Sequence, residues 1–242
     1  MGFRFAIILV TAVLLAVPAA AHAETVLAVY LGLAWAEDGT LRYTAPGGTD
    51  VRMDPTQWKT RSLTGPMYYG VRLTRWLPGR PGAGIALDFT HAKVYLDTTA
   101  NAHVTGTRGG APVDTVEPVS NTLSHFNNSH GLNLLTLNAL WRGDPPRPGD
   151  PKRGVTRPYA GFGLGVSIPH VEAQAALGDT FHYKYSGPAA QVLAGVSRTT
   201  AAGWEFFGEY KFSRSWLDEP LSGGDRVRLN ANVHHLLMGV GR

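Results

Sequence analysis

Apolar residues alternate with polar or small residues in eight stretches of about ten residues, which is the two-residue period of a β-strand. The clearest stretch spans 204–216, where Trp204, Phe206 and Tyr210 face one side and Glu209 and Lys211 face the other. This pattern predicts an all-β fold. The predicted strands span 24–36, 67–77, 83–95, 131–142, 157–168, 186–196, 204–216 and 226–240.

The lengths of the connections distinguish between two all-β architectures. Long joins at 37–66, 96–130 and 169–185 alternate with short or medium joins at 78–82, 143–156, 197–203 and 217–225. Outer-membrane barrels alternate long extracellular loops with short periplasmic turns in this way. We therefore predict an eight-stranded antiparallel up-and-down transmembrane barrel. A soluble periplasmic sandwich is the alternative.

Residues 1–23 have the three parts of a signal peptide. Arg4 gives a positive start, 5–17 is an apolar run, and Ala21 and Ala23 fit small-residue cleavage before Glu24. The apolar run is short for a membrane span, which needs about 20 residues. We expect export and cleavage, with 24–242 forming a single barrel domain in the outer membrane.

The composition excludes several classes of function. The chain has no cysteine, which rules out a disulfide framework, a thiolate metal site and a cysteine nucleophile. Its formal net charge of +4 favours anionic surroundings, but Lys and Arg are scattered, so we expect no nucleic-acid binding. The sequence contains no Gly-x-Ser-x-Gly motif, which disfavours a serine acyl hydrolase.

Polar residues on the strands predict a packed interior. An eight-stranded barrel is filled by side chains, so a wide pore is not expected. Arg72, Asp88, Glu209 and Lys211 are predicted to form a buried ion network. One of the adjacent residues His234 and His235 is also expected to face inward.

Strand direction places further polar residues at the outer rim of the barrel. If odd-numbered strands rise and even-numbered strands descend, titratable residues from four distant segments converge there. Lys and Arg could hold the phosphates of lipid A, while His and carboxylate side chains could move protons on a sugar. The candidate catalytic residues are Asp88, His91, His130, His170 and Glu172, and the candidate substrate-binding residues are Tyr68, Arg72, Lys93, Asn133, Glu209 and Lys211.

A metal site is one hypothesis for this rim. His170 and Glu172 stand at i and i+2 and share a face of an extended segment, so they could bind a divalent metal together with His91 and His130. The alternative is that these residues bond the loops or calcium-bridged lipopolysaccharide.

Five runs of the sequence resemble the lipid A oxidase family of small outer-membrane barrels. They are PMYYGVR at 66–72, LDFTHAKVY at 87–95, HGLNLLTLNAL at 130–140, IPHVE at 168–172 and EYK at 209–211. The resemblance extends from Tyr68 to His235. The chain departs from the pattern in a glycine-rich loop within 96–130 and in ending on Arg242, where barrels usually carry the aromatic residue that the outer-membrane assembly machinery reads.

The resemblance implies an oxidoreductase of the Gram-negative outer membrane. Such enzymes use molecular oxygen to convert the proximal glucosamine of 1-dephosphorylated lipid A to 2-aminogluconate, with peroxide as by-product. Lipid A or lipopolysaccharide and the assembly machinery are then the expected partners, and the divalent metal would provide the route to oxygen. The alternative function is a non-enzymatic structural or adhesive barrel.

Overall fold

The computed structural model describes residues 24–80, 82–128, 132–143, 154–175 and 178–242. The predicted signal peptide, residues 1–23, lies outside this part of the chain. The helices in the described ranges are two short 3-10 turns, η1 (Val119–Asn121) and η2 (Ser222–Gly224). No helix within these ranges is long and apolar enough to cross a membrane.

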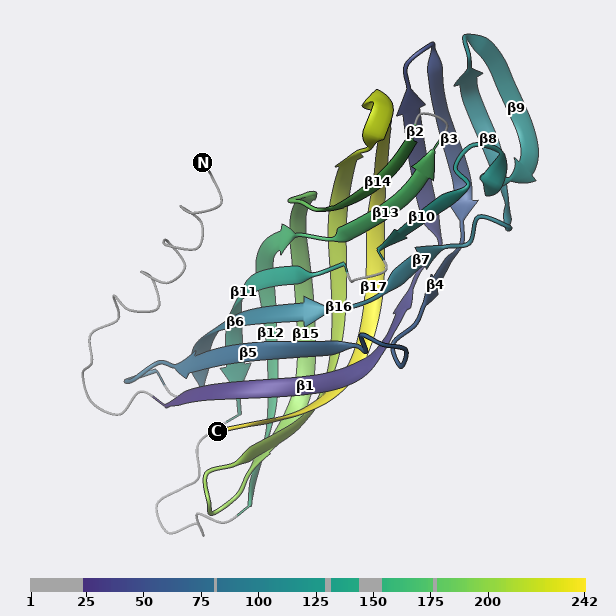
Figure 1. Cartoon of the computed structure of the whole chain (residues 1–242). Helices are drawn as coiled ribbons and strands as arrows, with labels where there is room; N and C mark the ends of the chain where they lie inside the picture. Colours follow the sequence, from purple (N-terminus) through teal and green to yellow (C-terminus); the bar gives the residue numbers. More distant parts are fainter. Residues whose placement is uncertain (1–23, 81, 129–131, 144–153, 176–177) are drawn as a thin grey trace.

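Eight strands close into an antiparallel up-and-down barrel (Figure 1). Each strand pairs with its neighbour in the barrel, and β1 and β17 close the ring through nine paired residues, from Ala28 opposite Gly241 to Ala36 opposite Val233. This confirms all eight predicted strands and excludes the sandwich. The strands are β1 (Thr25–Ala36), β5 (Tyr69–Trp76), β6 (Ala83–His91), β11 (Leu134–Arg142), β12 (Val155–Ser167), β15 (Gly187–Thr199), β16 (Glu205–Pro220) and β17 (Arg226–Gly241).

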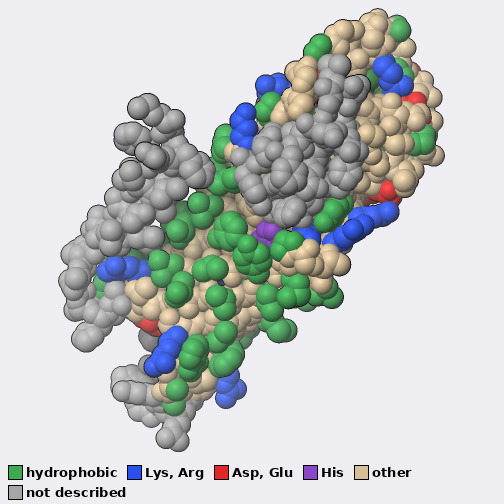
Figure 2. Space-filling model, viewed as in Figure 1, with side chains coloured by type: hydrophobic (Ala, Val, Ile, Leu, Met, Phe, Trp, Pro, Cys, Tyr) green, Lys and Arg blue, Asp and Glu red, His purple; other side chains and the backbone are tan. Residues whose placement is uncertain are grey.

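The outside of the barrel is apolar. On β1, Leu27, Val29, Leu31 and Leu33 are exposed, while Tyr30 between them is buried in the interior. Figure 2 shows hydrophobic side chains spread over the visible outer surface of the barrel. A closed barrel with an apolar outer surface and polar residues inside is the architecture of transmembrane barrels of the outer membrane.

The two ends of the barrel differ. The short turns at 77–82 and 200–204, the start of β1 and the end of β17 lie at one end, which we call the short-turn end. The long connections lie at the other end (Figure 1).

These long connections are not loops but two additional sheets, which we call the cap. One continues the barrel sheet outward from β17, and the other has five strands of its own. Periodicity did not predict these strands because most are short and are interrupted by Gly and Pro turns. The first sheet adds β2 (Gly39–Ala45), β3 (Thr49–Thr56), β8 (Asn101–Arg108) and β9 (Ala111–Pro118); the second contains β4 (Trp58–Thr60), β7 (Val94–Leu96), β10 (His125–Asn128), β13 (His170–Ala175) and β14 (Gly178–Tyr183).

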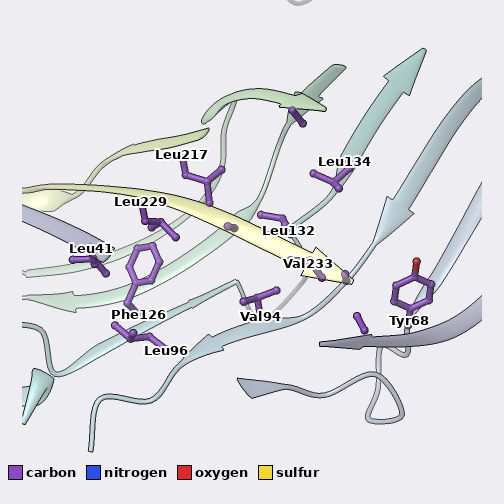
Figure 3. Close-up of a cluster of buried hydrophobic side chains, with 14 of the residues drawn as sticks. Leu41, Tyr68, Val94, Leu96, Phe126, Leu132, Leu134, Leu217, Leu229 and Val233 are labelled. Atoms are coloured by element: carbon purple, nitrogen blue, oxygen red, sulfur yellow. The ribbon is translucent and has the colours of Figure 1, made fainter. Parts of the chain in front are cut away.

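A hydrophobic core joins the cap to the barrel. Leu41 and Phe126, one from each cap sheet, are fully buried and belong to the same cluster as Leu134, Leu229 and Val233 of the barrel strands (Figure 3). Close packing of this kind leaves little room for solvent. The barrel is therefore closed by its own cap at the end where titratable residues were predicted to converge on the rim.

Candidate functional site

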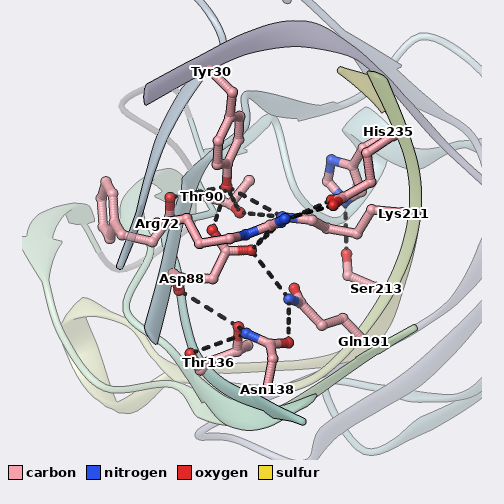
Figure 4. A network of polar contacts seen from close by, with 12 residues as sticks. Tyr30, Arg72, Asp88, Thr90, Thr136, Asn138, Gln191, Lys211, Ser213 and His235 are labelled. Carbon is pink, nitrogen blue, oxygen red and sulfur yellow. Dashed lines mark hydrogen bonds and ion pairs between the residues drawn. The ribbon is translucent and has the colours of Figure 1, made fainter. Parts of the chain in front are cut away.

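A network of four charged side chains crosses the barrel interior (Figure 4). Arg72 Nη2 lies 2.9 Å from Asp88 Oδ2, and Lys211 Nζ lies 2.7 Å from the same oxygen. Arg72 also binds Glu209 through both terminal nitrogens, at 2.5 and 2.8 Å. All four side chains are buried, so the predicted ion network is confirmed.

Neutral groups complete the hydrogen bonding of the two carboxylates. Tyr30 donates its hydroxyl to Asp88 at 2.8 Å, and Tyr159 donates to Glu209 at 2.7 Å. Gln191 donates to Asp88 at 3.2 Å. Gly70 makes room for this arrangement, because a Cβ there would lie 1.9 Å from the Tyr30 ring. With two cations, two anions and these donors, the buried charges compensate one another.

Little free space remains around the network. The void beside Arg72 and Tyr159 toward the short-turn end measures about 20 Å³, enough for about one water molecule. The geometry is that of a structural tie between strands.

The adjacent histidines of β17 separate as predicted. His235 faces inward, fully buried, with Nε2 2.8 Å from Ser213 Oγ. His234 faces outward, where its two ring nitrogens lie 2.6 Å from the Tyr210 hydroxyl and 2.9 Å from Glu37.

The predicted site residues near the mouth of the barrel are buried in the structure. His91 has Nδ1 2.9 Å from Asn133 Oδ1, and its ring stacks on Tyr69 at 4.8 Å between centroids. Lys93 donates to the backbone carbonyl of Gly65 at 2.5 Å and so holds the connection at 61–67 in place. Tyr68 packs beside the rings of Tyr30 and His235. Lys93 thus bonds a loop, which was the alternative considered for the rim residues.

The remaining predicted metal ligands lie partly outside the described residues. His130 is not one of the described residues. For His170 and Glu172 the structure describes only the backbone, which lies on β13 with Glu172 opposite Asn127 of β10. No three described His, Asp or Glu side chains lie close enough to hold one metal ion. The catalytic and metal-binding roles therefore stay predictions.

An apolar groove on the outside of the barrel was not expected from the sequence. It encloses about 530 Å³ between β1, β16, β17 and the connection at 61–67. Apolar side chains from the strands and from the connection line it, among them Leu33, Leu63, Met67 and Met238. Gly208 opens it, because nothing lies within 4 Å of where its Cβ would be. The feature of the sequence that could have indicated the groove is Gly208, which lies between the outward-facing Phe206 and Tyr210.

The pairing of β1 with β5 stops at Leu31. The connection at 61–67 is attached to the part of β1 beyond that point. Ala34 donates its backbone N–H to Ser62 Oγ at 2.8 Å, and Thr60 donates to the Ala34 carbonyl. Leu63 nevertheless remains 74% exposed. The groove thus has a fixed wall with an apolar side chain free to contact a ligand.

Glu219 is a buried carboxyl in the cap. It lies on β16 beyond Trp216, and its side chain is fully buried. The pKa of Glu219 is raised to about 7: burial is the largest cause and the nearby Asp218 acts in the same direction, while the Ser186 hydroxyl and Lys184 act in the opposite direction. This carboxyl changes its charge near neutral pH.

Comparison with known proteins gives distant structural similarity only. No family model and no curated protein sequence matches the chain. Among solved structures, it is similar to Neisserial surface protein A (NspA), with 13% identity and a TM-score of 0.45 over 91% of this chain and 98% of that one. It is also similar to Ail, the attachment invasion locus protein of Yersinia pestis, in complex with the heparin analogue sucrose octasulfate, with 9% identity and a TM-score of 0.33 over 88% and 99%.

We predict that replacing Arg72 will destabilise the barrel strongly. Arg72→Met leaves Asp88 and Glu209 short of a buried cation, which costs about 3–5 kcal/mol of unfolding free energy. Denaturant unfolding in detergent micelles measures this. Lys211 still compensates Asp88, so adding Glu209→Gln removes the one uncompensated charge and the double variant should recover part of the loss. Equal stability of Arg72→Met and the wild type would contradict the network as a structural tie.

We predict that Glu219 makes the cap less stable as the pH rises. Its folded pKa exceeds the ordinary value of 4.5, so the protonated form favours folding. Stability is fully present below the ordinary pKa and is lost as the pH rises to about 7, by about 3 kcal/mol in total. Hydrogen exchange of cap amides, corrected for intrinsic rates, measures this loss. Glu219→Gln should abolish it, whereas Asp218→Asn at the exposed neighbour should retain most of it, because burial is the larger cause of the raised pKa.

Proposed function

We propose that this protein resides in the Gram-negative outer membrane, exported by the predicted signal peptide, and engages lipid A in the outer leaflet. The short-turn end would face the periplasm and the cap the outside, in keeping with the loop pattern of such barrels. The observation that carries the proposal is the apolar groove between β1, β16 and β17.

The position of the groove favours an acyl chain as its ligand. It opens on the apolar outer surface beside Leu31 and Leu236 and lies toward the cap, bounded by the connection that enters β5. In the proposed orientation this is the depth of the outer-leaflet acyl chains. A groove with few polar groups in contact with lipid is suited to a hydrocarbon chain. Lipid A is the acylated glycolipid of that leaflet.

Oxidation of lipid A is the activity that the sequence resemblance implies, and we propose it as the reaction to test. The proximal glucosamine would lose two electrons and two protons at C1, with water supplying the second carboxyl oxygen, and molecular oxygen would accept both to give hydrogen peroxide. His91 is the only one of the four predicted metal ligands whose side chain the structure describes. The proposed reaction is therefore written without a metal-dependent step. Because His91, Asp88 and Lys93 are buried, the reaction would also require a movement that exposes them to the substrate.

A structural or adhesive barrel is the second candidate. The specific observation in its favour is the filled mouth: the core around Leu41 and Phe126 closes the barrel, and the cap sheets extend beyond it. This candidate requires no open site among the predicted catalytic residues.

The oxidase proposal predicts a change in lipid A itself. Lipid A from a host that makes the 1-dephosphorylated form and lacks such an oxidase should gain one oxygen on the proximal sugar when the gene is expressed. Mass spectrometry with and without air measures this. An unchanged spectrum, with heat-modifiable protein present in the outer membrane, would favour the structural barrel.

Binding of lipid A is predicted to depend on the groove and not on the reaction. Gly208→Phe should fill the groove without a backbone clash, because its Cβ position is open. Native mass spectrometry of detergent-extracted protein should then show several-fold less retained lipid A than the wild type. Ala160→Phe, on the outer face of β12, is the matched control and should retain lipid A normally. Equal retention in both variants would refute the groove as the binding site.

A further inference from the structure

Four arginines lie on the outer face of the cap where β17, β2 and β3 run side by side. The strand register places Arg228 opposite Arg42, and Arg42 opposite Arg52, so three guanidinium groups from three adjacent strands form one row. Arg226 stands two residues farther along β17 on the same face. We call these four residues the arginine face.

The arginine face lies on the same outer side of β17 as the apolar surface of the barrel. Outward-facing residues of β17 alternate without interruption from Met238 and Leu236 on the apolar surface to Arg228 and Arg226. Because side chains two apart share a face of a strand, the arginines continue the surface that contacts lipid below them. The ten residues from Met238 to Arg228 correspond to about 33 Å along the strand.

Adjacent arginines in a row repel one another unless anions compensate them. Aspartates provide part of this compensation: Asp50 binds Arg42 through two hydrogen bonds at 2.8 and 2.6 Å, and Asp54 binds Arg52 at 2.7 Å. Asp218 is shared between Arg226 at 2.8 Å and Arg228 at 3.3 Å. Three carboxylates therefore serve four guanidinium groups.

The arginines keep donors free for a further anion. Their side chains are between 41% and 60% exposed, and each guanidinium carries five N–H donors of which the aspartates use one or two. A surface groove of about 470 Å³ is lined by Arg42 and Arg52, by Asp50, which binds Arg42, and by Thr40, Thr105 and Gly106. Guanidinium forks with neighbouring hydroxyls are suited to phosphate groups on a sugar.

We propose that the arginine face binds the phosphorylated core saccharide of the lipopolysaccharide molecules that surround the barrel. The inference rests on the proposed outer-membrane location but does not require oxidation of lipid A. In the proposed orientation, the apolar groove and the arginine face lie along the same strand in the order in which lipopolysaccharide presents its acyl chains and its anionic sugars. Charge complementarity and this order identify the ligand.

The test compares two forms of lipopolysaccharide. Purified protein in micelles is titrated with lipopolysaccharide carrying the phosphorylated core and with a form truncated to lipid A. The variant Arg42→Gln/Arg52→Gln/Arg228→Gln should bind the first form about tenfold more weakly, from the modest free energy of each exposed contact, and the truncated form as the wild type does. The variant Arg80→Gln/Arg198→Gln/Arg242→Gln, at the short-turn end, removes the same charge and should bind both forms normally.

A second variant changes the affinity in the opposite direction. Asp50→Asn/Asp54→Asn frees two guanidinium groups from their internal partners and should strengthen binding of the phosphorylated form, with a steeper dependence on salt. Heat-modifiable migration on gels confirms that each variant is folded.

The outcomes separate this inference from the proposed function. Equal weakening by the two triple variants would overturn the arginine face as the site. Binding of a sulfated oligosaccharide such as heparin, without any effect of the core phosphates, would overturn the proposed ligand in favour of an external glycan. Failure of the wild type to bind truncated lipopolysaccharide, with binding of the phosphorylated form intact, would instead refute lipid A engagement and support the arginine face alone.

Discussion

The charge network inside the barrel is the interaction on which the rest of the structure depends. A closed sheet in lipid has to direct its charged side chains inward, and buried charges are tolerated only when they are paired. Arg72 meets this requirement by bridging Asp88 and Glu209, while Lys211 binds Asp88 from the opposite side. The four residues lie on β5, β6 and β16, so the network ties distant parts of the ring together.

Because the network fills the barrel, the long connections are left to determine how the protein meets its surroundings. They pair into two sheets around a core that includes Leu41 and Phe126, and this core closes the mouth. The surfaces available for ligands are therefore on the outside. The apolar groove and the arginine face both use β17, whose outer side changes from apolar to charged as the strand passes from the barrel to the cap.

Many features of the fold and part of the site could be predicted because strand alternation is a local property. The pattern at 204–216 separated Phe206 and Tyr210 from Glu209 and Lys211, and the structure places the first pair outside and the second inside. The cap could not be predicted in this way. Its strands, such as β4 and β7, have three residues each and are held by partners far away in the sequence.

The sequence by itself determined the eight strands, their two faces and the charges that have to pair inside, because each follows from the period of a strand and from the cost of a buried charge. Tertiary structure alone decided that the rim is covered, since contacts such as the one from Lys93 to the Gly65 carbonyl join segments that are 28 residues apart in the chain. It also brought Arg42, Arg52 and Arg228 into one row. Register between strands distant in the chain sets such contacts, and no local pattern records that register.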